Sequence, residues 1–360
     1  MKSKCRFVVL GGAGTIGRVV VRDLFESSSG NRILIADYNE KAARRLASSL
    51  GGGRVRAVFV DARQDLSPLL KNQTVVINCL QYNFNLPVMK AALSAGVHYL
   101  DLGGLFSVTR QQLRLNKAFK DAGLTAIIGM GCAPGITNIL AGYAASLLHK
   151  VESIKIRVGS IDFGPPSKKL RLPYSAQTIV EELTLKPWVF RDGKFCEISP
   201  RTGWERTQFP KPVGKAWTLW TRHSEIATLP LSFRKKGLKY CDFKVGFDPK
   251  FVREVMKRLR SGWDMNRFNK LMTSVRHPND YEVSQVTVGD LVVECFASPR
   301  PEWHAGAGDI DTACPASIVA QMVADGQVDQ RGVLPPEIAV PVLSFFRELE
   351  KRGLHVTIRH

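Results

Sequence analysis

Short apolar runs alternate with amphipathic stretches over the first third of the chain. This alternation is typical of a parallel sheet whose strands are joined by helices and covered on both faces. The helical stretches include Glu40–Leu50, Leu86–Ala95 and Ser107–Ala122. The apolar runs predicted as strands are Phe7–Leu10, Arg32–Asp37, Val55–Val60, Val75–Leu80, Val97–Leu102 and Leu124–Gly129. Six strands with intervening helices predict an α/β fold with a doubly wound Rossmann sheet.

The pattern changes after about Gly131. Ser153–Ser160 and Tyr281–Phe296 alternate in period two, as half-buried antiparallel strands do. Helical spacing returns in Pro315–Asp325 and Pro336–Arg352. We therefore predict a dinucleotide-binding domain over residues 1–130 and a second, α+β mixed-sheet domain over 131–313 for substrate binding and dimerisation. C-terminal helices over 314–360 are expected to return to the first domain.

The first strand runs into the sequence Gly-Gly-Ala-Gly-Thr-Ile-Gly. Gly12 permits the tight turn out of the strand, Gly14 lets the backbone approach a pyrophosphate, and Gly17 lets the helix pack closely on the sheet. The helix N-terminus supplies N–H groups and a positive dipole end to the phosphates. Together with Thr15 and Ile16 between them, these glycines are the predicted cofactor contacts.

Asp37 ends the second strand 20 residues after Gly17. A carboxylate at this place can bond the ribose hydroxyls and repels a 2′-phosphate, which favours NAD over NADP. Arg44 and Arg45, a short way downstream, leave NADP as the second possibility. Asp61, after the third strand, is expected either near the adenine ring or at the surface.

Ligands of open α/β sheets bind at the carboxyl ends of the strands. By this rule, residues after the fourth and sixth strands are further predicted cofactor contacts: Asn78, Cys79, Leu80 and Gly131. Tyr82, also after the fourth strand, is expected to lie near the substrate. Asp101 ends the fifth strand beside two glycines. Its carboxylate could hold a substrate ammonium or take its proton, or it could cap the helix beginning near Val108.

In the second domain, Arg222-His223-Ser224-Glu225 combines a base and a carboxylate. If the segment is a strand, His223 and Glu225 share a face, so His223 could act as a general base that Glu225 orients. A hydrogen-bonded structural pair is the alternative. Substrate contacts are predicted for Arg222 and, more weakly, for Tyr174 and Arg171. Cys132 is expected to be a small residue in a tight turn rather than a nucleophile.

The chain carries a formal net charge of +19, and residues 201–260 hold 15 Lys and Arg against 5 Asp and Glu. A solvated basic surface explains this excess better than nucleic-acid binding, because no nucleic-acid motif surrounds it. The seven cysteines have no disulfide or metal-ligand spacing, so no metal site is predicted. Leu124–Leu148 is uncharged, but glycines and a proline interrupt it. We expect a soluble, cytoplasmic protein without a membrane or nucleic-acid partner.

Several segments make the chain resemble the saccharopine dehydrogenase superfamily, and within it the bacterial lysine 6-dehydrogenases. The resemblance implies a nicotinamide cofactor, an amino-acid substrate and a homodimer or higher oligomer formed through the second domain. The segments that carry it are Val76–Pro87, Ala95–Leu105, Gly129–Asn138, Val151–Gly159, Leu185–Gly193, His223–Pro230 and Ser317–Pro336.

For a lysine 6-dehydrogenase the implied reaction is oxidation of L-lysine at C6 by NAD⁺, with release of ammonia and NADH and cyclisation of the semialdehyde. Asp101, His223 and Glu225 are then the candidate proton-transfer groups. The acids that flank Pro-Gly-Ile in saccharopine reductases are Ala133 and Thr137 here, which argues against saccharopine as substrate. The alternatives are a saccharopine- or carboxynorspermidine-type enzyme acting on a secondary amine, and a catalytically silent NAD-binding protein with a basic interaction face.

Overall fold

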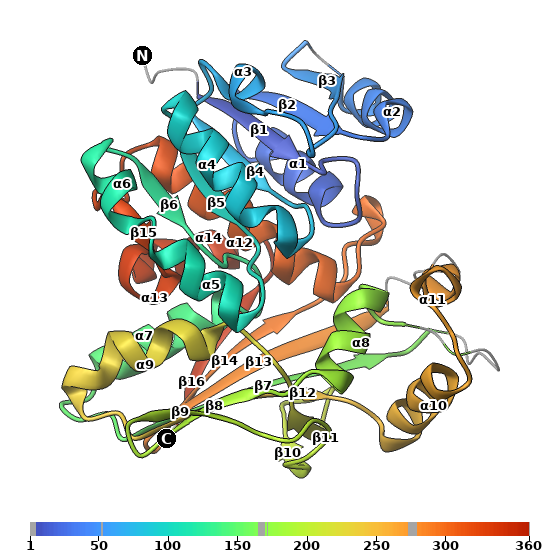
Figure 1. Ribbon diagram of the computed structural model, residues 1–360, viewed down its shortest axis with the longest axis vertical. Helices are drawn as coiled ribbons and strands as arrows, with labels where there is room; N and C mark the ends of the chain where they lie inside the picture. The colour runs from blue at the N-terminus through green and yellow to red at the C-terminus, as the bar shows by residue number, and fades with distance from the viewer. Residues whose placement is uncertain (1–4, 52, 165–169, 171, 273–278, 360) are drawn as a thin grey trace. The chain divides into compact units, whose positions relative to one another are not determined.

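The structure is a computed structural model that describes residues 5–51, 53–164, 170, 172–272 and 279–359 (Figure 1). Contacts within the chain divide it into two compact units. The first unit comprises Met1–Gly142 and Asp311–Gly353, and the second comprises Tyr143–Ile310 and Leu354–His360. The divisions fall inside helices α7 (Ile136–Ser146) and α12 (Ala307–Ala324).

The first unit is built on a parallel sheet in the order β15-β6-β5-β4-β1-β2-β3. This order reverses at β1, between β4 and β2, which is the switch point where such sheets bind ligands. The strands are β1 (Arg6–Leu10), β2 (Arg32–Asp37), β3 (Val55–Phe59), β4 (Val75–Asn78), β5 (His98–Asp101), β6 (Thr125–Ile127) and β15 (Gly332–Leu334). The predicted doubly wound sheet is confirmed, and β15 extends it beyond the predicted strands.

Helices cover the sheet, and their ends follow local chemistry. The carboxamide of Asn39 accepts a hydrogen bond from the N–H of Ala42 at 3.1 Å and so caps α2. Gly96 ends α4 in the left-handed conformation. The helices are α1 (Gly17–Glu26), α2 (Glu40–Leu50), α3 (Ser67–Leu70), η1 (Tyr82–Phe84), α4 (Asn85–Ala95), α5 (Phe106–Leu113), α6 (Asn116–Asp121), α13 (Pro336–Ala339) and α14 (Val342–Glu350).

Two helices that the sequence predicts as continuous are broken. The predicted helix over residues 107–122 becomes α5 and α6, and the one over 336–352 becomes α13 and α14. Pro341 separates the second pair, because proline disfavours helical geometry in the residue before it and has no N–H to donate. α14 is tied to α1 in the same unit, since Arg352 donates to Asp23 at 2.8 and 3.0 Å.

The second unit is built on a mixed sheet in the order β10-β11-β12-β7-β13-β14-β16, with β8 paired to β12 and β9 paired to β8. β12 and β7 are parallel, and the other pairs are antiparallel. The strands are β7 (Ser153–Asp162), β8 (Trp188–Arg191), β9 (Lys194–Glu197), β10 (Glu205–Gln208), β11 (Lys215–Trp220), β12 (Tyr240–Gly246), β13 (Asp280–Val288), β14 (Leu291–Ala297) and β16 (His355–Arg359). A mixed sheet with helices confirms the predicted α+β class.

One C-terminal prediction needs correction. Residues 311–353 belong to the first unit, as the expected return requires, but β16 pairs with β14 in the second unit. The last residues therefore form an edge strand rather than part of a helix. The helices of the second unit are α8 (Ala176–Thr184), α9 (Glu225–Phe233), η2 (Arg234–Lys236), α10 (Pro249–Arg260), α11 (Met265–Met272) and η3 (Pro301–Trp303).

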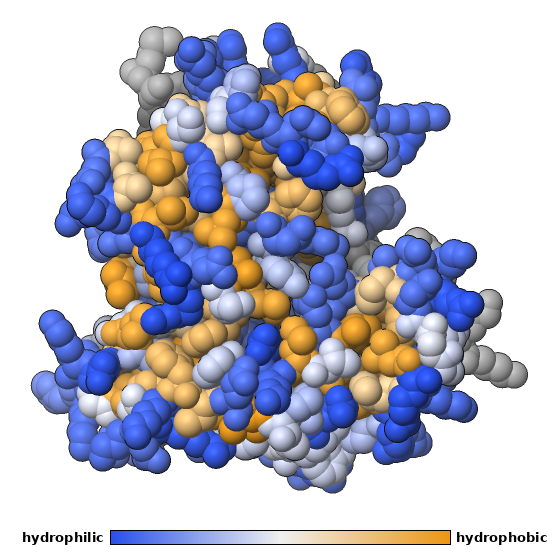
Figure 2. All heavy atoms as spheres, in the orientation of Figure 1, coloured by the Kyte–Doolittle hydropathy of each residue, from blue (hydrophilic) through white to orange (hydrophobic). Residues whose placement is uncertain are grey.

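Each unit has an apolar interior. In the first, Leu10, Val76 and Tyr99 are fully buried members of one core cluster. On the face shown in Figure 2, hydrophilic side chains gather over α2 in the first unit and over α10 in the second. In the described part of the chain, every helix is too short or too polar to cross a bilayer, including the region of the uncharged stretch over residues 124–148.

Candidate functional site

The turn between β1 and α1 has no room for side chains at its glycines. A Cβ on Gly17 would lie 2.1 Å from the Gly11 carbonyl oxygen, and one on Gly12 would lie 2.9 Å from the Val9 carbonyl oxygen. These contacts force the loop to stay bare, so that a phosphate can approach the backbone. Within these described residues, α1 begins without a side-chain cap, with Ile16 at the N-cap. Its first N–H groups are thus positioned for a pyrophosphate, and the loop fits a dinucleotide.

Asp37 is held beside this loop at the carboxyl end of β2. One carboxylate oxygen accepts a hydrogen bond from the N–H of Ala13 at 2.9 Å, and the other accepts one from the N–H of Asn39 at 2.8 Å. The acid is therefore fixed at the place predicted for a ribose-binding carboxylate. Next to it, the exposed rings of Tyr38 and Phe59 lie 5.4 Å apart. An aromatic surface there could pack against an adenine ring, and the sequence analysis did not single it out.

Asp61 is engaged by a neighbour. Its carboxylate pairs with the Arg63 guanidinium at 2.6 Å, and that hydrogen bond lowers the pKa of Asp61 to about 2. Arg44, which left NADP open, pairs with Glu40 at 2.6 Å. Arg63 and Arg44 thus each have a carboxylate partner within their own segment.

The residues predicted after β4 lie next to the glycine turn. A Cβ on Gly11 would meet the Leu80 side chain at 3.0 Å and the Cys79 carbonyl oxygen at 3.2 Å. Asn78, however, is fully buried, and its amide donates to Asn85 at 3.0 Å. Its side chain supports the loop from inside rather than reaching a ligand.

Other predicted positions at this edge are also packed inside the first unit. Tyr82 is half-buried and begins η1 after β4. Gly131 is buried after β6, where a Cβ would lie 3.3 Å from the Thr312 side chain. The parallel sheet brings these loops to the same edge as the glycine turn.

Asp101 is an internal anchor of the first unit. It is fully buried, and one carboxylate oxygen accepts from the N–H groups of Gly103 at 2.8 Å and Gly129 at 2.7 Å. The other oxygen accepts from the Tyr99 hydroxyl at 2.8 Å and the Gln112 amide at 2.5 Å. Burial raises the pKa of the Asp101 carboxyl, and these four donors oppose the rise. The four donors occupy the carboxylate, which favours a positioning role that joins β5 to the loop after β6 over the predicted catalytic role.

The second unit contains a buried cluster of one histidine and two carboxylates. His223 Nε2 lies 2.9 Å from a Glu182 oxygen, and Nδ1 lies 3.3 Å from a Glu225 oxygen. The Tyr174 hydroxyl donates to the other oxygen of Glu182. The imidazole stacks on the Phe243 ring at 3.8 Å. The structure therefore brings Tyr174 to the predicted pair of His223 and Glu225, and we call Tyr174, Glu182, His223 and Glu225 the histidine cluster.

The cluster holds more negative than positive charge. Desolvation lowers the pKa of His223, but the charge of Glu225 and the hydrogen bond with Glu182 outweigh it and raise the pKa to about 10. His223 is thus an imidazolium at neutral pH, and two carboxylates leave one net negative charge. In this form the histidine can donate a proton, whereas the predicted role as a general base needs its neutral form, and the two carboxylates can attract a cation.

The local backbone also differs from the prediction. Glu225 lies in the first turn of α9 and not on a strand, where its carboxylate is favourable for the helix dipole. Among the three charged groups, the side chain of His223 is the most exposed, at 14%, against 4% for Glu182 and 0% for Glu225. His223 is therefore the member of the cluster that a ligand can reach.

The remaining predicted substrate contacts do not join this cluster. Arg222 donates to the Lys186 carbonyl oxygen at 2.8 Å and to Glu197 at 3.1 Å, so it fastens the segment before α9 to β9. Arg171 lies outside the described residues. Glu182 was not predicted, because it lies on α8, 41 residues from His223 along the chain.

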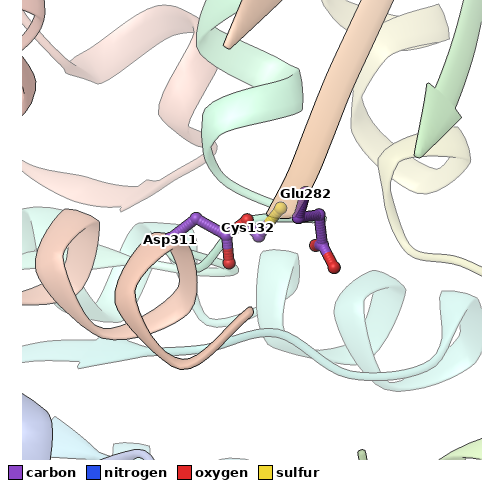
Figure 3. A group of neighbouring side chains, drawn as sticks. All are labelled: Cys132, Glu282 and Asp311. Carbon is purple, nitrogen blue, oxygen red and sulfur yellow. The ribbon is translucent and has the colours of Figure 1, made fainter. Parts of the chain in front are cut away.

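Cys132 has a carboxylate neighbour in the first unit. Its Sγ lies within 4.8 Å of a carboxylate oxygen of Asp311, on α12, and both residues are buried (Figure 3). Glu282, drawn in the same view, belongs to β13 of the second unit. A nearby negative charge disfavours a thiolate, which agrees with the prediction that Cys132 is not a nucleophile.

Known proteins resemble the chain over nearly its whole length. Residues 7–127 match the family model "Saccharopine dehydrogenase NADP binding domain", and residues 131–354 match "Saccharopine dehydrogenase C-terminal domain". In structure, the chain is similar to apo saccharopine dehydrogenase (L-Glu forming) from Saccharomyces cerevisiae, with a TM-score of 0.74, 15% identity and 99% of each chain covered. At this identity the likeness shows the fold.

Two curated relatives are more similar in sequence. Carboxyaminopropylagmatine dehydrogenase of Synechocystis is 28% identical over 234 residues, covering 62% of this chain and 58% of the relative. Carboxynorspermidine synthase of Vibrio cholerae is 26% identical over 264 residues, covering 67% of this chain and 63% of the relative. The match thus spans about three fifths of the length of each relative.

Proposed function

Since the chain belongs to the saccharopine dehydrogenase family, we propose that it is a nicotinamide-dependent oxidoreductase that acts at a C–N bond of a cationic amine. The observation that carries the proposal is the histidine cluster, in which two buried carboxylates lie 2.9 and 3.3 Å from His223. Its net negative charge attracts an ammonium group, and its imidazolium supplies a proton.

The direction that the cluster supports best is reductive. An aldehyde and an amine first form a carbinolamine, which must lose water to give an iminium ion, and a general acid promotes that loss. An imidazolium held by Glu182 and Glu225 is such an acid. A bound nicotinamide cofactor would then supply the hydride. We therefore propose that the enzyme joins an amine to a carbonyl compound to make a secondary amine. The names of two curated relatives, a carboxyaminopropylagmatine dehydrogenase and a carboxynorspermidine synthase, support a polyamine-type substrate.

Oxidation of L-lysine at C6 is the second candidate. It rests on the sequence segments that resemble the lysine 6-dehydrogenases and on Ala133 and Thr137, which replace the acids of saccharopine reductases. Lysine oxidation needs a base for the ε-ammonium, whereas His223 is already protonated at neutral pH. For this reason the reductive reaction ranks first.

The test follows NADH and NADPH absorbance in both directions. Reductively, the enzyme is given carboxylate-bearing aldehydes together with diamines, and we expect cofactor oxidation only when both are present. Oxidatively, it is given NAD⁺ or NADP⁺ and L-lysine, with ammonia measured. Lysine-dependent ammonia release without reductive coupling would establish the second candidate. Absence of activity in both directions would exclude both candidate functions.

The matched variants are His223→Gln and Arg222→Gln. The first removes the proposed acid, and we expect turnover to fall by about 10²-fold or more while substrate KM changes less. The second changes the adjacent side chain, whose partners Lys186 and Glu197 lie away from the cluster, and should leave turnover near that of the parent. Equal losses in both variants would mean that His223 acts only through the local fold.

For the cofactor we propose NAD, although the matching family model is named for NADP. Asp37 is fixed beside the glycine turn, where its charge would oppose a 2′-phosphate. Asp37→Ser should raise the NADPH/NADH ratio of kcat/KM by about tenfold or more, because about 1.4 kcal/mol of repulsion corresponds to that factor. Glu26→Gln, an exposed acid on α1, is the charge-matched control. An unchanged ratio in the Asp37 variant would remove Asp37 from this role.

A further inference from the structure

The strand β16 lies at one edge of the mixed sheet in the second unit (Figure 1). In the described part of the chain it pairs with β14 alone, through five consecutive residue pairs. Half of the N–H and C=O groups of an edge strand point away from its sheet, so such an edge can accept a further strand. Four of the five residues of β16 are exposed, and the fifth, Val356, is half-buried. The strand is therefore accessible to another chain.

The centre of β16 lacks the features that usually prevent an edge strand from pairing with another chain. Val356, Thr357 and Ile358 carry no charge, the strand contains no proline, and its pairing with β14 contains no bulge. Ile358 is apolar and 44% exposed. The strand at the opposite edge of the sheet, β10, instead has Glu205 and Arg206 among its four residues. The edge at β16 is therefore the one of these two that favours a partner.

The sequence of β16 is complementary to itself. When two copies of the strand pair antiparallel with Thr357 at the centre, all five residues of each copy have a partner. Thr357 then faces Thr357 of the partner subunit, and Val356 faces Ile358 of the partner subunit. The two-fold axis repeats the second of these pairs. Thr–Thr pairs are favourable across antiparallel strands, and the two Val–Ile pairs remove apolar surface from water.

The arginine at the end of the strand is compatible with this pairing. Arg359 would lie opposite His355 of the partner subunit, but its guanidinium already donates to Glu294 of its own copy at 3.0 and 3.2 Å. Glu294 is 3% exposed, so it stays beside Arg359 when a second strand is added. The pairing therefore brings no unbalanced guanidinium charge against the partner subunit.

We propose that β16 binds a second copy of the chain by antiparallel pairing about a two-fold axis at Thr357, which joins the two mixed sheets edge to edge. A strand pair of this length buries less than the about 1,200 Å² at the lower end of stable interfaces. The dimer is therefore reversible, and its fraction rises with the protein concentration. The proposal uses no residue of the histidine cluster, so it does not depend on the reaction.

The first test is sedimentation velocity of the full chain over a range of concentrations, and we expect a monomer–dimer equilibrium. Ile358→Lys places a charge in the contact twice, once in each subunit, and should raise the dissociation constant of the dimer by about tenfold or more. The control is Leu231→Lys on α9, where the parent side chain is 46% exposed, and it should associate as the parent does. A parent that stays monomeric, or equal effects of the two variants, would overturn the proposal.

The second test examines the register and does not depend on Ile358→Lys. In Thr357→Cys two thiols face each other on the two-fold axis, with Cβ atoms about 4.5 to 5.5 Å apart, which a small backbone adjustment brings to disulfide distance. Mild oxidation should therefore link the subunits, and a non-reducing gel measures the linked fraction. Thr178→Cys, at an exposed position on α8, is the control and should not form the link. Absence of the link in Thr357→Cys, or an equal linked fraction in the control, would refute pairing about Thr357.

Discussion

The strongest electrostatic prediction concerns the charge of His223. Its pKa of about 10 depends on two carboxylates, of which Glu225 is fully buried 3.3 Å away. Glu225→Gln keeps the shape of this side chain and removes its charge. Because an opposite charge at such a distance shifts a pKa by about one to three units, the variant should lower the pKa of His223 by that amount.

The same shift has a stabilising effect with a defined pH window. The pKa rises from 6.5 in the unfolded chain to about 10 in the folded one, and each unit corresponds to about 1.4 kcal/mol, so protonated His223 stabilises the fold by at most about 5 kcal/mol. This contribution is complete below pH 6.5 and is lost as the pH rises to about 10. Glu225→Gln should remove about 1.4 to 4 kcal/mol of it at neutral pH.

The direct assay is NMR titration of histidine-labelled protein, with His223→Gln to assign the signal. His98 is the internal control in the same spectra. Its Nδ1 accepts from the N–H of Thr125 at 3.0 Å, and desolvation lowers its pKa below 6.5. The two histidines should therefore titrate on opposite sides of the normal value. Titration of His223 near pH 6.5 in the parent protein would refute the charge assignment. The charge assignment would also be refuted if the difference in unfolding free energy between the parent and Glu225→Gln did not decrease as the pH approaches 10.

Three further predictions concern the first unit. Arg352→Met leaves Asp23 buried without its partner and should cost about 3 to 5 kcal/mol in urea unfolding, while adding Asp23→Leu should recover most of the loss; an unchanged midpoint would contradict this. Gly17→Ala should abolish NADH binding in calorimetry because its Cβ cannot fit, whereas Gly30→Ala, with open space around it, should bind as the parent does. Asp101→Asn places an amide donor among four donors and should lower the unfolding free energy by about 1 to 3 kcal/mol. A turnover loss at unchanged stability would instead restore Asp101 as a catalytic residue.

Much of the first unit could be predicted because its signals are local. A strand, a bare glycine turn and an acid one strand later form a continuous pattern, and the sheet in the structure follows it. Short elements gave no such signal. β15 has three residues, and its place beside β6 depends on hydrogen bonds to a segment distant in sequence. β16 has five residues, and it is a strand only through its pairing with β14, which lies far away in the sequence.

The candidate site was predictable only in part, for a related reason. His223 and Glu225 stand out because they are only two positions apart in sequence, but their geometry depends on α9 beginning at Glu225. Glu182 is an ordinary glutamate in a helical segment, and only the tertiary fold brings it to the imidazole. For Asp101 the sequence signal was stronger than the structure supports. Its place at a strand end suggests catalysis, whereas four hydrogen-bond donors inside the unit occupy its carboxylate.

The net charge of the chain does not argue against a cationic substrate. A formal charge of +19 repels an ammonium ion at long range, but salt screens exposed charges beyond about 8 Å. Glu182 and Glu225 act at contact distance, are almost fully buried, and interact through a medium less polarisable than water, where the attraction per charge is several times larger. The local excess of one negative charge therefore favours a cationic ligand at His223.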